Sequence, residues 1–451
     1  MGLALLYDAA DRAGHYAAQL DGRAVFPSEA AVEALSAFDE AMPSDPATAA
    51  SVLEMLDDFG SPATVAMAGR RYFGFVTGGS LPAALAANWL AGAWDQNAGL
   101  VVCSPTAAKL EAVAAGWLVD LMNLPAGTQV GFVTGATMAN FSALAAARHS
   151  VLAQTGWNVE EDGLFGAPPI TVYIGDEAHV SLLKALGMLG LGRKRVVRVP
   201  VDRQGRMRAD VFPEIQGPAI VCLQAGNVNT GAFDPAAEIC AVAHQAGAWV
   251  HVDAAFGLWA AAAPSRAHLM DGANQADSWA TDGHKWLNVP YDCGLVFVRN
   301  GIAMKAAMST AQAAYLVEGG AREPSHYTPE LSRRARGVEV WAALKSLGKN
   351  GLAEMIETTC AHARRFAEVL SAAGYRVGNE VFLNQVLVSF GSDETTGRVI
   401  SAIQSGGVCW CGPTEWQGRA YMRISVSSWA TTAADVEICL DAILSAAQKP
   451  V

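Results

Sequence analysis

The feature that most constrains this chain is a short apolar run, AWVHVDAAF, which contains an acidic residue, Asp253, towards its end. The run lies between Gly247 and Gly257 and is rich in Val and Trp, as is typical of a strand buried on both faces of a mostly parallel sheet. Ligands of open α/β sheets bind outside the carboxyl ends of such strands. The sequence therefore predicts an α/β fold with Asp253 at the ligand-binding edge of its sheet.

A lysine with unusual neighbours follows in the same region. Lys285 lies just beyond a second apolar run at 278–280, with His284 before it and Trp286 after it. A single lysine or aspartate is usually solvated or caps a turn. Together, however, an amine and a carboxylate can bind pyridoxal 5'-phosphate, because the lysine forms a Schiff base and the acid keeps the pyridine nitrogen protonated. We interpret Asp253 and Lys285 as that pair.

A phosphate-binding turn is predicted upstream of this pair. The apolar run that ends at Val133 leads through the small residues of 134–137 into an alanine-rich helix. Small residues let the backbone approach a phosphate, and the N-terminus of the helix directs N–H groups and a partial positive charge towards it. The hydroxyl of Thr137 can add a further contact, whereas Asn140 can serve as a capping residue or a ring contact.

Two more apolar runs end in polar turns. The run at 170–175 leads to His179, which can be a histidine at the start of a solvated helix or a ligand-binding residue. The run at 219–224 leads to Asn227, whose amide can contact a cofactor or close the turn. Because the carboxyl ends of parallel strands share one edge, both turns are candidates for the same site as Asp253.

The segments HVDAAF and GHKWLNVPYDCG resemble those of the group II pyridoxal-phosphate-dependent amino-acid decarboxylases, which include aromatic amino-acid and glutamate decarboxylases. The likeness runs from about residue 70 to about residue 345. It implies fold type I: a large domain with a mostly parallel mixed sheet, a smaller C-terminal α/β domain and a helical N-terminal arm. We place the arm and a pocket-mouth loop at 1–85, the large cofactor-binding domain at 86–315, and a mobile loop with the C-terminal domain at 316–451.

The resemblance also implies an activity. It predicts an enzyme, a carboxy-lyase, that converts an L-amino acid to its amine and CO2 through a Schiff base on Lys285. The alternative is an aldolase, an aldehyde-forming enzyme or another enzyme that cleaves a bond at Cα on the same fold. A non-catalytic pyridoxal-phosphate-binding protein is a third possibility, and the intact pair of Asp253 and Lys285 argues against it.

The resemblance assigns roles to individual residues. His179 is expected to stack on the pyridine ring and to shape the site for the substrate carboxylate. A tyrosine in the loop at 310–336 is expected to return a proton to the substrate carbon, with Tyr327 as the candidate and Tyr315 as the alternative. His179 is the other candidate for this proton transfer. The predicted cofactor-binding set is Ala136, Thr137, His179, Asn227, Asp253, Ala255, His284 and Lys285.

Substrate contacts and a partner subunit are implied in the same way. Phe75 falls on a position that is aromatic in the aromatic amino-acid decarboxylases, whereas Gly74 stands where those enzymes tend to carry a second aromatic residue. Arg423 resembles in position an arginine that binds the substrate carboxylate in related aminotransferases, and a structural salt bridge is an equal alternative. Residues 92–105 resemble a segment that reaches into the neighbouring subunit's pocket, which predicts a homodimer.

Composition excludes several other classes of protein. Thirty-one basic and 43 acidic residues give a net charge of −12, which argues against a nucleic-acid partner or an anionic membrane surface. The first residues, MGLALLYDAADRAGHY, lack the basic start of a signal peptide, and no apolar run is long enough to span a membrane. The eight cysteines are scattered, and Cys409 and Cys411 have the wrong spacing for a usual metal site. We therefore expect a cytoplasmic enzyme without a metal.

Overall fold

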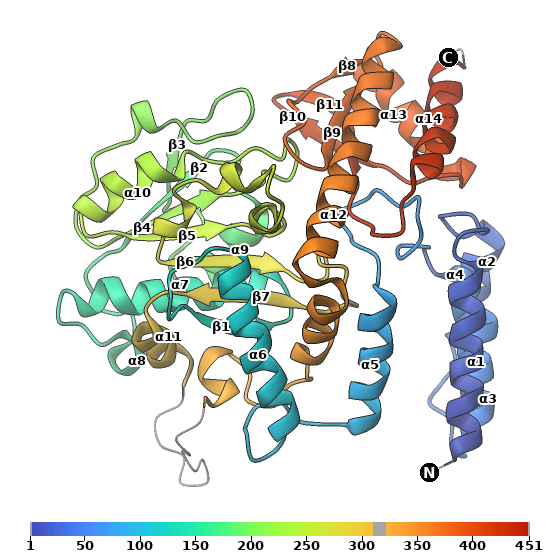
Figure 1. The fold of residues 1–451 in the computed structure, drawn as a ribbon, viewed down its shortest axis with the longest axis horizontal. Helices are drawn as coiled ribbons and strands as arrows, with labels where there is room; N and C mark the ends of the chain where they lie inside the picture. The colour runs from blue at the N-terminus through green and yellow to red at the C-terminus, as the bar shows by residue number, and fades with distance from the viewer. Residues whose placement is uncertain (1, 310–321, 450–451) are drawn as a thin grey trace. The chain divides into compact units, whose positions relative to one another are not determined.

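The structure is a computed structural model, and it describes residues 2–309 and 322–449 (Figure 1). The chain divides into two compact units. The larger unit comprises residues 80–364 and 379–386, and the smaller unit comprises residues 1–79, 365–378 and 387–451. This division differs from the boundaries predicted at 85/86 and 315/316, because the N-terminal segment shares a unit with most of the C-terminal segment. The second predicted boundary lies outside the described residues.

The larger unit is built on a seven-stranded mixed sheet with the order β1-β7-β6-β5-β4-β2-β3. Parallel pairing joins β6 to β5, β5 to β4, β4 to β2 and β2 to β3, whereas β7 runs antiparallel to both of its neighbours. The strands are β1 (Gln129–Val133), β2 (Thr171–Gly175), β3 (Val197–Val199), β4 (Ala219–Gln224), β5 (Trp249–Asp253), β6 (Ser278–Asp282) and β7 (Gly294–Val298).

The direction of these strands positions the site. Because β1 and β6 both run antiparallel to β7, they point the same way as each other. The carboxyl ends of β1, β2, β4, β5 and β6 therefore open at one edge of the sheet. Asp253 is the last residue of β5, and Lys285 follows the end of β6 by one turn. The predicted position of Asp253 at the ligand-binding edge agrees with this topology.

Helices cover the sheet of the larger unit. Helix α7 packs on β5, β6 and β7 and is flanked by α9 and α11. Its apolar face and residues such as Val133, Val296 and Val298 form one buried cluster. Leu295 and Phe297, which alternate with the valines along β7, are equally buried, so β7 is covered on both faces. The helices are α5 (Pro82–Trp94), α6 (Pro105–Leu121), α7 (Ala136–Ala153), α8 (Val159–Asp162), α9 (Val180–Met188), α10 (Ala236–Gln245), α11 (Gly301–Met308) and α12 (Gly337–Ala372), with short 3-10 turns η3 (Ala209–Val211), η4 (Gly257–Ala262), η5 (Ala267–Met270), η6 (Ala273–Gln275) and η7 (Pro324–Tyr327).

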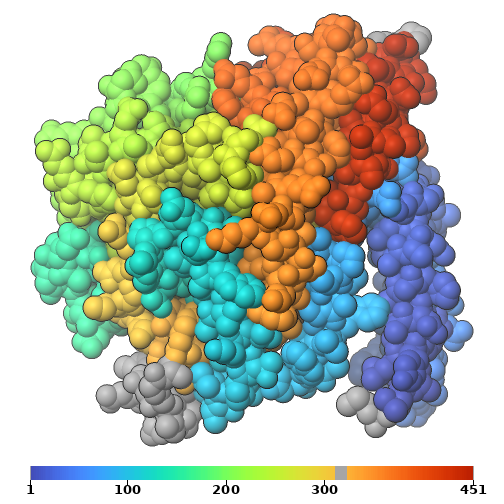
Figure 2. Space-filling model, viewed as in Figure 1, coloured from blue at the N-terminus to red at the C-terminus, as the bar shows by residue number. Residues whose placement is uncertain are grey.

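Helices α6 and α12 lie side by side in the ribbon and in the space-filling view (Figures 1 and 2). Trp117 of α6 stacks on Trp341 of α12 with ring centroids 6.3 Å apart. Helix α12 is interrupted at Gly348, which has a φ of 61°. A left-handed conformation costs glycine little because it has no Cβ atom. The first part of α12 belongs to the larger unit, and its last residues belong to the smaller one.

The smaller unit combines N-terminal helices with a C-terminal α/β segment. Its four-stranded sheet has the order β10-β11-β9-β8, in which β10 pairs antiparallel with β11 and β8 pairs antiparallel with β9. Within residues 2–309 and 322–449, none of the helices is long and apolar enough to span a bilayer. The elements are α1 (Leu3–Gln19), α2 (Glu29–Glu33), η1 (Ala34–Phe38), α3 (Ala49–Met55), η2 (Leu56–Gly60), α4 (Ser61–Ala63), β8 (Arg376–Val377), β9 (Gln385–Ser389, whose first two residues fall in the larger unit), α13 (Asp393–Gly406), β10 (Gly412–Trp416), β11 (Arg419–Ser425) and α14 (Ala433–Gln448).

Candidate active site

The lysine side chain is held at the carboxyl edge of the sheet by a carboxylate that the sequence pattern did not single out. The Nζ atom of Lys285 lies 3.0 Å from the Oδ2 atom of Asp282, the last residue of β6. The other oxygen of Asp282 accepts a hydrogen bond of 2.5 Å from the backbone N–H of Ala136. Asp282 therefore links the lysine to the first turn of α7. Its spacing of three residues from Lys285 was a signal in the sequence.

Around the turn between β1 and α7 there is space for the backbone but little space for side chains at the glycine positions. A Cβ atom on Gly294 would lie 2.4 Å from the Cα atom of Gly135, and a Cβ atom on Gly135 would lie 3.2 Å from the ring of His284. Gly135 is the N-cap residue of α7, and its position provides no side-chain cap. The half-buried Thr137 follows in the first turn. This helix N-terminus, predicted to bind phosphate, thus lies beside the Lys285 segment.

Asp253 is buried and accepts a hydrogen bond from helix α7. The Nδ2 atom of Asn140 donates to the Oδ2 atom of Asp253 over 3.0 Å. This contact answers the open question about Asn140, which is a partner of the carboxylate rather than a helix cap. Burial raises the pKa of Asp253, while the nearby His179, the Asn140 hydrogen bond and the Lys285 ammonium lower it. Asp253 and Lys285 lie at the carboxyl ends of neighbouring parallel strands, and their joint contact with a cofactor stays a prediction.

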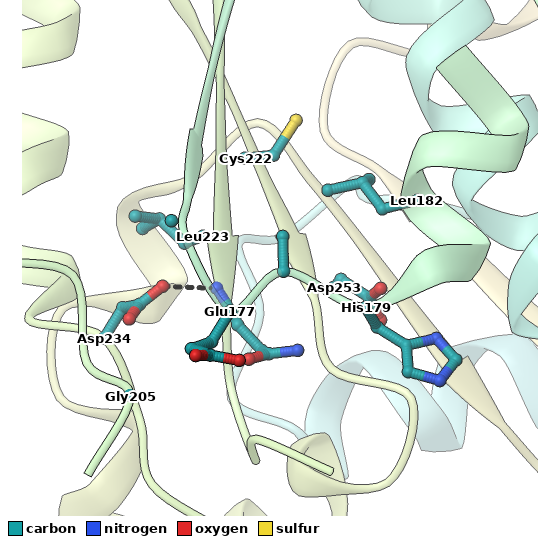
Figure 3. A pocket seen from close by; sticks show the side chains of 11 residues that line it. Glu177, His179, Leu182, Gly205, Cys222, Leu223, Asp234 and Asp253 are labelled. Atoms are coloured by element: carbon teal, nitrogen blue, oxygen red, sulfur yellow. Dashed lines mark hydrogen bonds between the residues drawn. The ribbon is translucent and has the colours of Figure 1, made fainter. Parts of the chain in front are cut away.

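A small cavity of about 10 Å³ lies beside Asp253 (Figure 3). Its lining includes Glu177, His179, Cys222 and Gln224 as well as Asp253. His179 and Asp253 lie on the same side of this cavity, although one precedes α9 and the other ends β5 (Figure 3). The ring of His179 is also the N-cap of α9, because its Nδ1 atom accepts a hydrogen bond from the N–H of Ser181. Both sequence interpretations of His179 thus describe part of its environment.

Asp234 lies at the opposite side of the same cavity (Figure 3). Its carboxylate accepts hydrogen bonds from the N–H groups of Met207 and Gln224 over 2.7 and 2.6 Å. Burial raises its pKa to about 6. Because its two oxygens bind backbone donors, Asp234 fixes the wall of the cavity.

Ala255 and His284 connect the turns that follow β5 and β6. The carbonyl oxygen of Ala255 accepts a hydrogen bond of 2.8 Å from the N–H of Asp282. The Nδ1 atom of His284 accepts one of 3.0 Å from the N–H of Cys293, and its ring stacks on Tyr291 with centroids 4.3 Å apart. Burial lowers the pKa of His284. Both predicted cofactor-binding residues therefore lie next to Lys285 and Asp282.

Asn227 closes the turn after β4. Its Oδ1 atom accepts hydrogen bonds from the N–H groups of Asn229 and Thr230, and its Nδ2 atom donates to the side chain of Gln224. These contacts support the second of the two interpretations that the sequence left open, in which the amide shapes the turn. Its predicted contact with the cofactor stays a prediction.

Tyr327 lies in the hydrophobic core of the larger unit. It ends η7, and its side chain packs in the cluster that contains Val133 and Met304. The guanidinium carbon of Arg322 is 4.1 Å from the centre of its ring. The backbone of Tyr327 lies close to β1, because a Cβ atom on Gly131 would lie 2.0 Å from the Tyr327 carbonyl oxygen. The structure therefore does not group this ring with the residues around Asp253, and Tyr315 lies outside the described residues.

Phe75 and Arg423 belong to the smaller unit. Phe75 has a φ of 53° and an exposed ring that lies 5.4 Å from the ring of Trp410. A Cβ atom on Gly74 would lie only 2.2 Å from the Trp410 ring, so the tryptophan fills the space that a side chain at 74 would need. Arg423 lies in β11, and burial lowers its pKa. The substrate contacts of both residues stay predictions.

The cysteine pair that the sequence interpreted as structural is buried. Cys409 and Cys411 are fully buried. The eight cysteines are free thiols. Within residues 2–309 and 322–449, no group of three or more His, Cys, Asp and Glu side chains is arranged to hold a metal ion.

Comparison with known proteins decides the family. A family model described as the pyridoxal-dependent decarboxylase conserved domain matches residues 33–390. The chain belongs to that family. It is therefore a pyridoxal-phosphate-dependent amino-acid decarboxylase by descent, which confirms the predicted family, enzyme class and cofactor.

Relatives and solved structures agree with this assignment. The aromatic-L-amino-acid decarboxylase of Drosophila lebanonensis is 28% identical over 403 residues, which cover 83% of this chain and 97% of that protein. The phenylacetaldehyde synthase of Petunia hybrida is 28% identical over 290 residues, covering 60% and 56%. The crystal structure of Oryza sativa TDC with PLP and tryptamine matches with a TM-score of 0.90 and 22% identity, covering 98% and 97%. The last match confirms the predicted fold class.

The residues at the site suit pyridoxal phosphate. The amine of Lys285 lies beside the carboxylate of Asp282 rather than in bulk solvent, and Gly135 leaves the backbone at the N-terminus of α7 near it. The buried carboxylate of Asp253 has a raised pKa, and a cationic ring nitrogen would compensate its charge. In this decarboxylase the amine, the carboxylate and the helix N-terminus therefore match the aldehyde, the ring nitrogen and the phosphate of the cofactor.

Proposed function

We propose that this decarboxylase removes the α-carboxylate of an L-amino acid and releases the amine and CO2, with Lys285 holding the cofactor through its amine. The observation that carries the proposal is that Asp253 ends β5 and Lys285 follows the neighbouring parallel strand β6, so both lie at the carboxyl edge of the sheet, where Asp282 holds the lysine amine. When bound, pyridoxal phosphate supplies a sink for the electrons of a bond that breaks at Cα.

The residues of the chain have separate tasks in this reaction. Asp253 holds a positive charge on the ring nitrogen, and the first turn of α7 holds the phosphate. The bond that breaks joins Cα to the carboxyl carbon; its electron pair stays on the Cα side, CO2 leaves, and a proton takes the vacated position. Burial of the site limits solvation of the substrate carboxylate, which favours its loss. Asp282 keeps the amine of Lys285 at the site when it is not bound to the cofactor.

The source of the proton is a choice between two predicted residues. Support for His179 comes from its place in the lining of the cavity beside Asp253. Tyr327 is less well supported because its ring is 4% exposed and packs in the core. We expect His179→Gln to lower kcat by about 10²-fold or more, the usual contribution of a positioned proton donor, while Tyr327→Phe keeps turnover and product. Single-turnover assays of both variants measure this, and the reverse result would return the role to Tyr327.

The activity itself is tested by offering the purified holoenzyme a panel of L-amino acids and measuring CO2, amine and aldehyde. We expect CO2 and the amine in equal amounts from at least one member of the panel. Aldehyde in place of amine would support the second candidate, aldehyde formation, for which the likeness to the phenylacetaldehyde synthase of Petunia hybrida speaks. Glycine as the product would indicate aldol cleavage and would exclude the decarboxylase proposal.

We also infer a homodimer that completes the site. Support comes from helix α1, which buries none of its residues and exposes Leu3, Leu6 and Tyr7. Val102, in the segment predicted to reach the partner, is 83% exposed. Light scattering that gives the mass of one 47.2 kDa chain would contradict this inference.

The cytoplasmic location remains a proposal, with the free cysteines as its support.

A further inference from the structure

A chain of hydrogen bonds runs through the core and ends on Asp253. Trp249, His251 and Asp253 lie on the same face of β5 because side chains alternate along a strand. Ser278 is the register partner of His251 on β6. The indole Nε1 of Trp249 is 2.8 Å from the Ser278 Oγ, which is 3.0 Å from the Nδ1 of His251. The Nε2 of His251 is 2.9 Å from the Oδ1 of Asn140, whose Nδ2 is 3.0 Å from Asp253.

The chemistry of these groups fixes the direction of each bond. A carboxylate only accepts, so the amide nitrogen of Asn140 donates to Asp253 and its Oδ1 atom faces His251. That oxygen only accepts, so the Nε2 atom of His251 carries a proton. Since a neutral imidazole carries one proton, its Nδ1 atom accepts from the hydroxyl of Ser278, whose oxygen accepts from the indole N–H of Trp249. Every donor in the chain therefore points towards the carboxylate.

The surroundings favour the neutral form of the histidine that this direction requires. His251, Ser278 and Asn140 are fully buried, and Trp249 and Asp253 nearly so. Burial lowers the pKa of His251 to about 3. Hydrogen bonds that follow one another in the same direction polarise each other, more so away from water. The chain thus places the positive ends of its dipoles at Asp253, a buried carboxylate whose ionised form burial disfavours.

We propose that Asn140, His251 and Ser278 are positioning residues that hold Asp253 ionised and aimed at the ring nitrogen of the cofactor. This inference rests on the proposed function for the reaction that Asp253 assists. It goes beyond that function because it assigns a role to residues that touch neither cofactor nor substrate. The loss of kcat on substitution should be smaller for a residue that more hydrogen bonds separate from the Asp253 carboxylate.

Variants of single links test the chain. We expect His251→Leu to lower kcat by about 10-fold to 100-fold, the scale found when a residue that orients a ligand is lost. His251→Gln, whose amide can donate to Asn140 and accept from Ser278, should restore most of that loss. Ser278→Ala should cost less than His251→Leu. Ser142→Ala is the matched control, because Ser142 is an equally buried serine of α7 whose hydroxyl donates to the carbonyl of Met138.

Two measurements distinguish a loss of positioning at Asp253 from a loss of stability of the folded protein. The visible absorption of the bound cofactor is recorded against pH. If the interaction between the Asp253 carboxylate and the ring nitrogen is weaker, the nitrogen loses its proton at a lower pH. The melting temperature and KM are measured beside kcat, and we expect both to change little in Ser278→Ala and His251→Gln. An unchanged kcat and absorption profile in a folded His251→Leu protein would overturn the proposal.

Side-chain 15N spectra of the wild-type protein, with and without pyridoxal phosphate, provide a test that needs no variant and no turnover. The proposal requires a His251 ring protonated on Nε2 that does not titrate between pH 5 and 8. A ring that is protonated on Nδ1, or charged in that range, would overturn the directed chain even if His251→Leu fails to fold. Absence of amine from wild-type holoenzyme with this tautomer in place would instead count against the proposed function alone.

Discussion

Lys285→Ala is expected to abolish the visible absorption band that the holoenzyme retains after dialysis and to lower turnover by about 10⁴-fold or more, as when one member of a covalent catalytic group is removed. Without the amine, the cofactor loses its covalent bond to the chain. The helix N-terminus of α7 and Asp253 remain, so weak non-covalent binding of pyridoxal phosphate should persist at high concentration. Absorption spectra before and after dialysis, together with amine release, measure the change.

Borohydride reduction makes this prediction specific for one residue. In the wild-type protein, reduction should attach the cofactor permanently, and the peptide that contains Lys285 should carry the added mass. Lys184→Ala is the matched control, because Lys184 is an exposed lysine on α9, the helix that His179 caps. A reducible cofactor that stays on Lys285→Ala would place the covalent bond on a different lysine.

Asp253→Asn is expected to lower kcat by about 10²-fold to 10³-fold, which is typical when one electrostatic contact to the reacting group is lost. The substitution keeps the size of the side chain, and Asn140 can still donate to the new amide oxygen. A neutral amide, however, cannot compensate a positive ring nitrogen. The pH at which the ring nitrogen loses its proton should therefore fall, which the cofactor's absorption records.

A cofactor analogue that lacks the ring nitrogen shows whether Asp253 acts through that atom. The wild-type protein loaded with the deaza analogue should lose about as much activity as Asp253→Asn loaded with pyridoxal phosphate. Combining the variant with the analogue should cost little more, because both changes remove the same interaction. Losses that multiply would show that Asp253 supports catalysis in some other way.

The sequence predicted the parts of the site that depend on local pattern. Asp253 and Lys285 follow apolar runs, and a polar residue at the end of a buried parallel strand lies at the ligand-binding edge whatever the rest of the fold. The turn before Ala136 was found in the same way, since small residues between a strand and a helix N-terminus allow a phosphate to reach the backbone N–H groups. The resemblance to a known family then identified the fold and the cofactor.

The sequence could not predict contacts that depend on how distant elements pack. Asn140 had two local interpretations, and its partner became evident only once α7 lay across β5. His251 and Ser278 are within strands, where a polar residue gives no sign of what it will face. Tyr327 packs in the core with residues of distant elements such as Val133 and Met304, and a stretch that lacks periodicity gives no signal of such contacts.

The antiparallel strand β7 has a consequence for how this protein is made. Strand β1 pairs only with β7 within the sheet, although 160 residues separate the two strands in the chain. A nascent chain released from the ribosome before Val298 would therefore leave β1 without a neighbour and the turn before α7 without its place beside Lys285. Distant pairings of this kind form late and slowly. The enzyme should acquire its cofactor only after the last strand of the larger sheet has been synthesised and inserted.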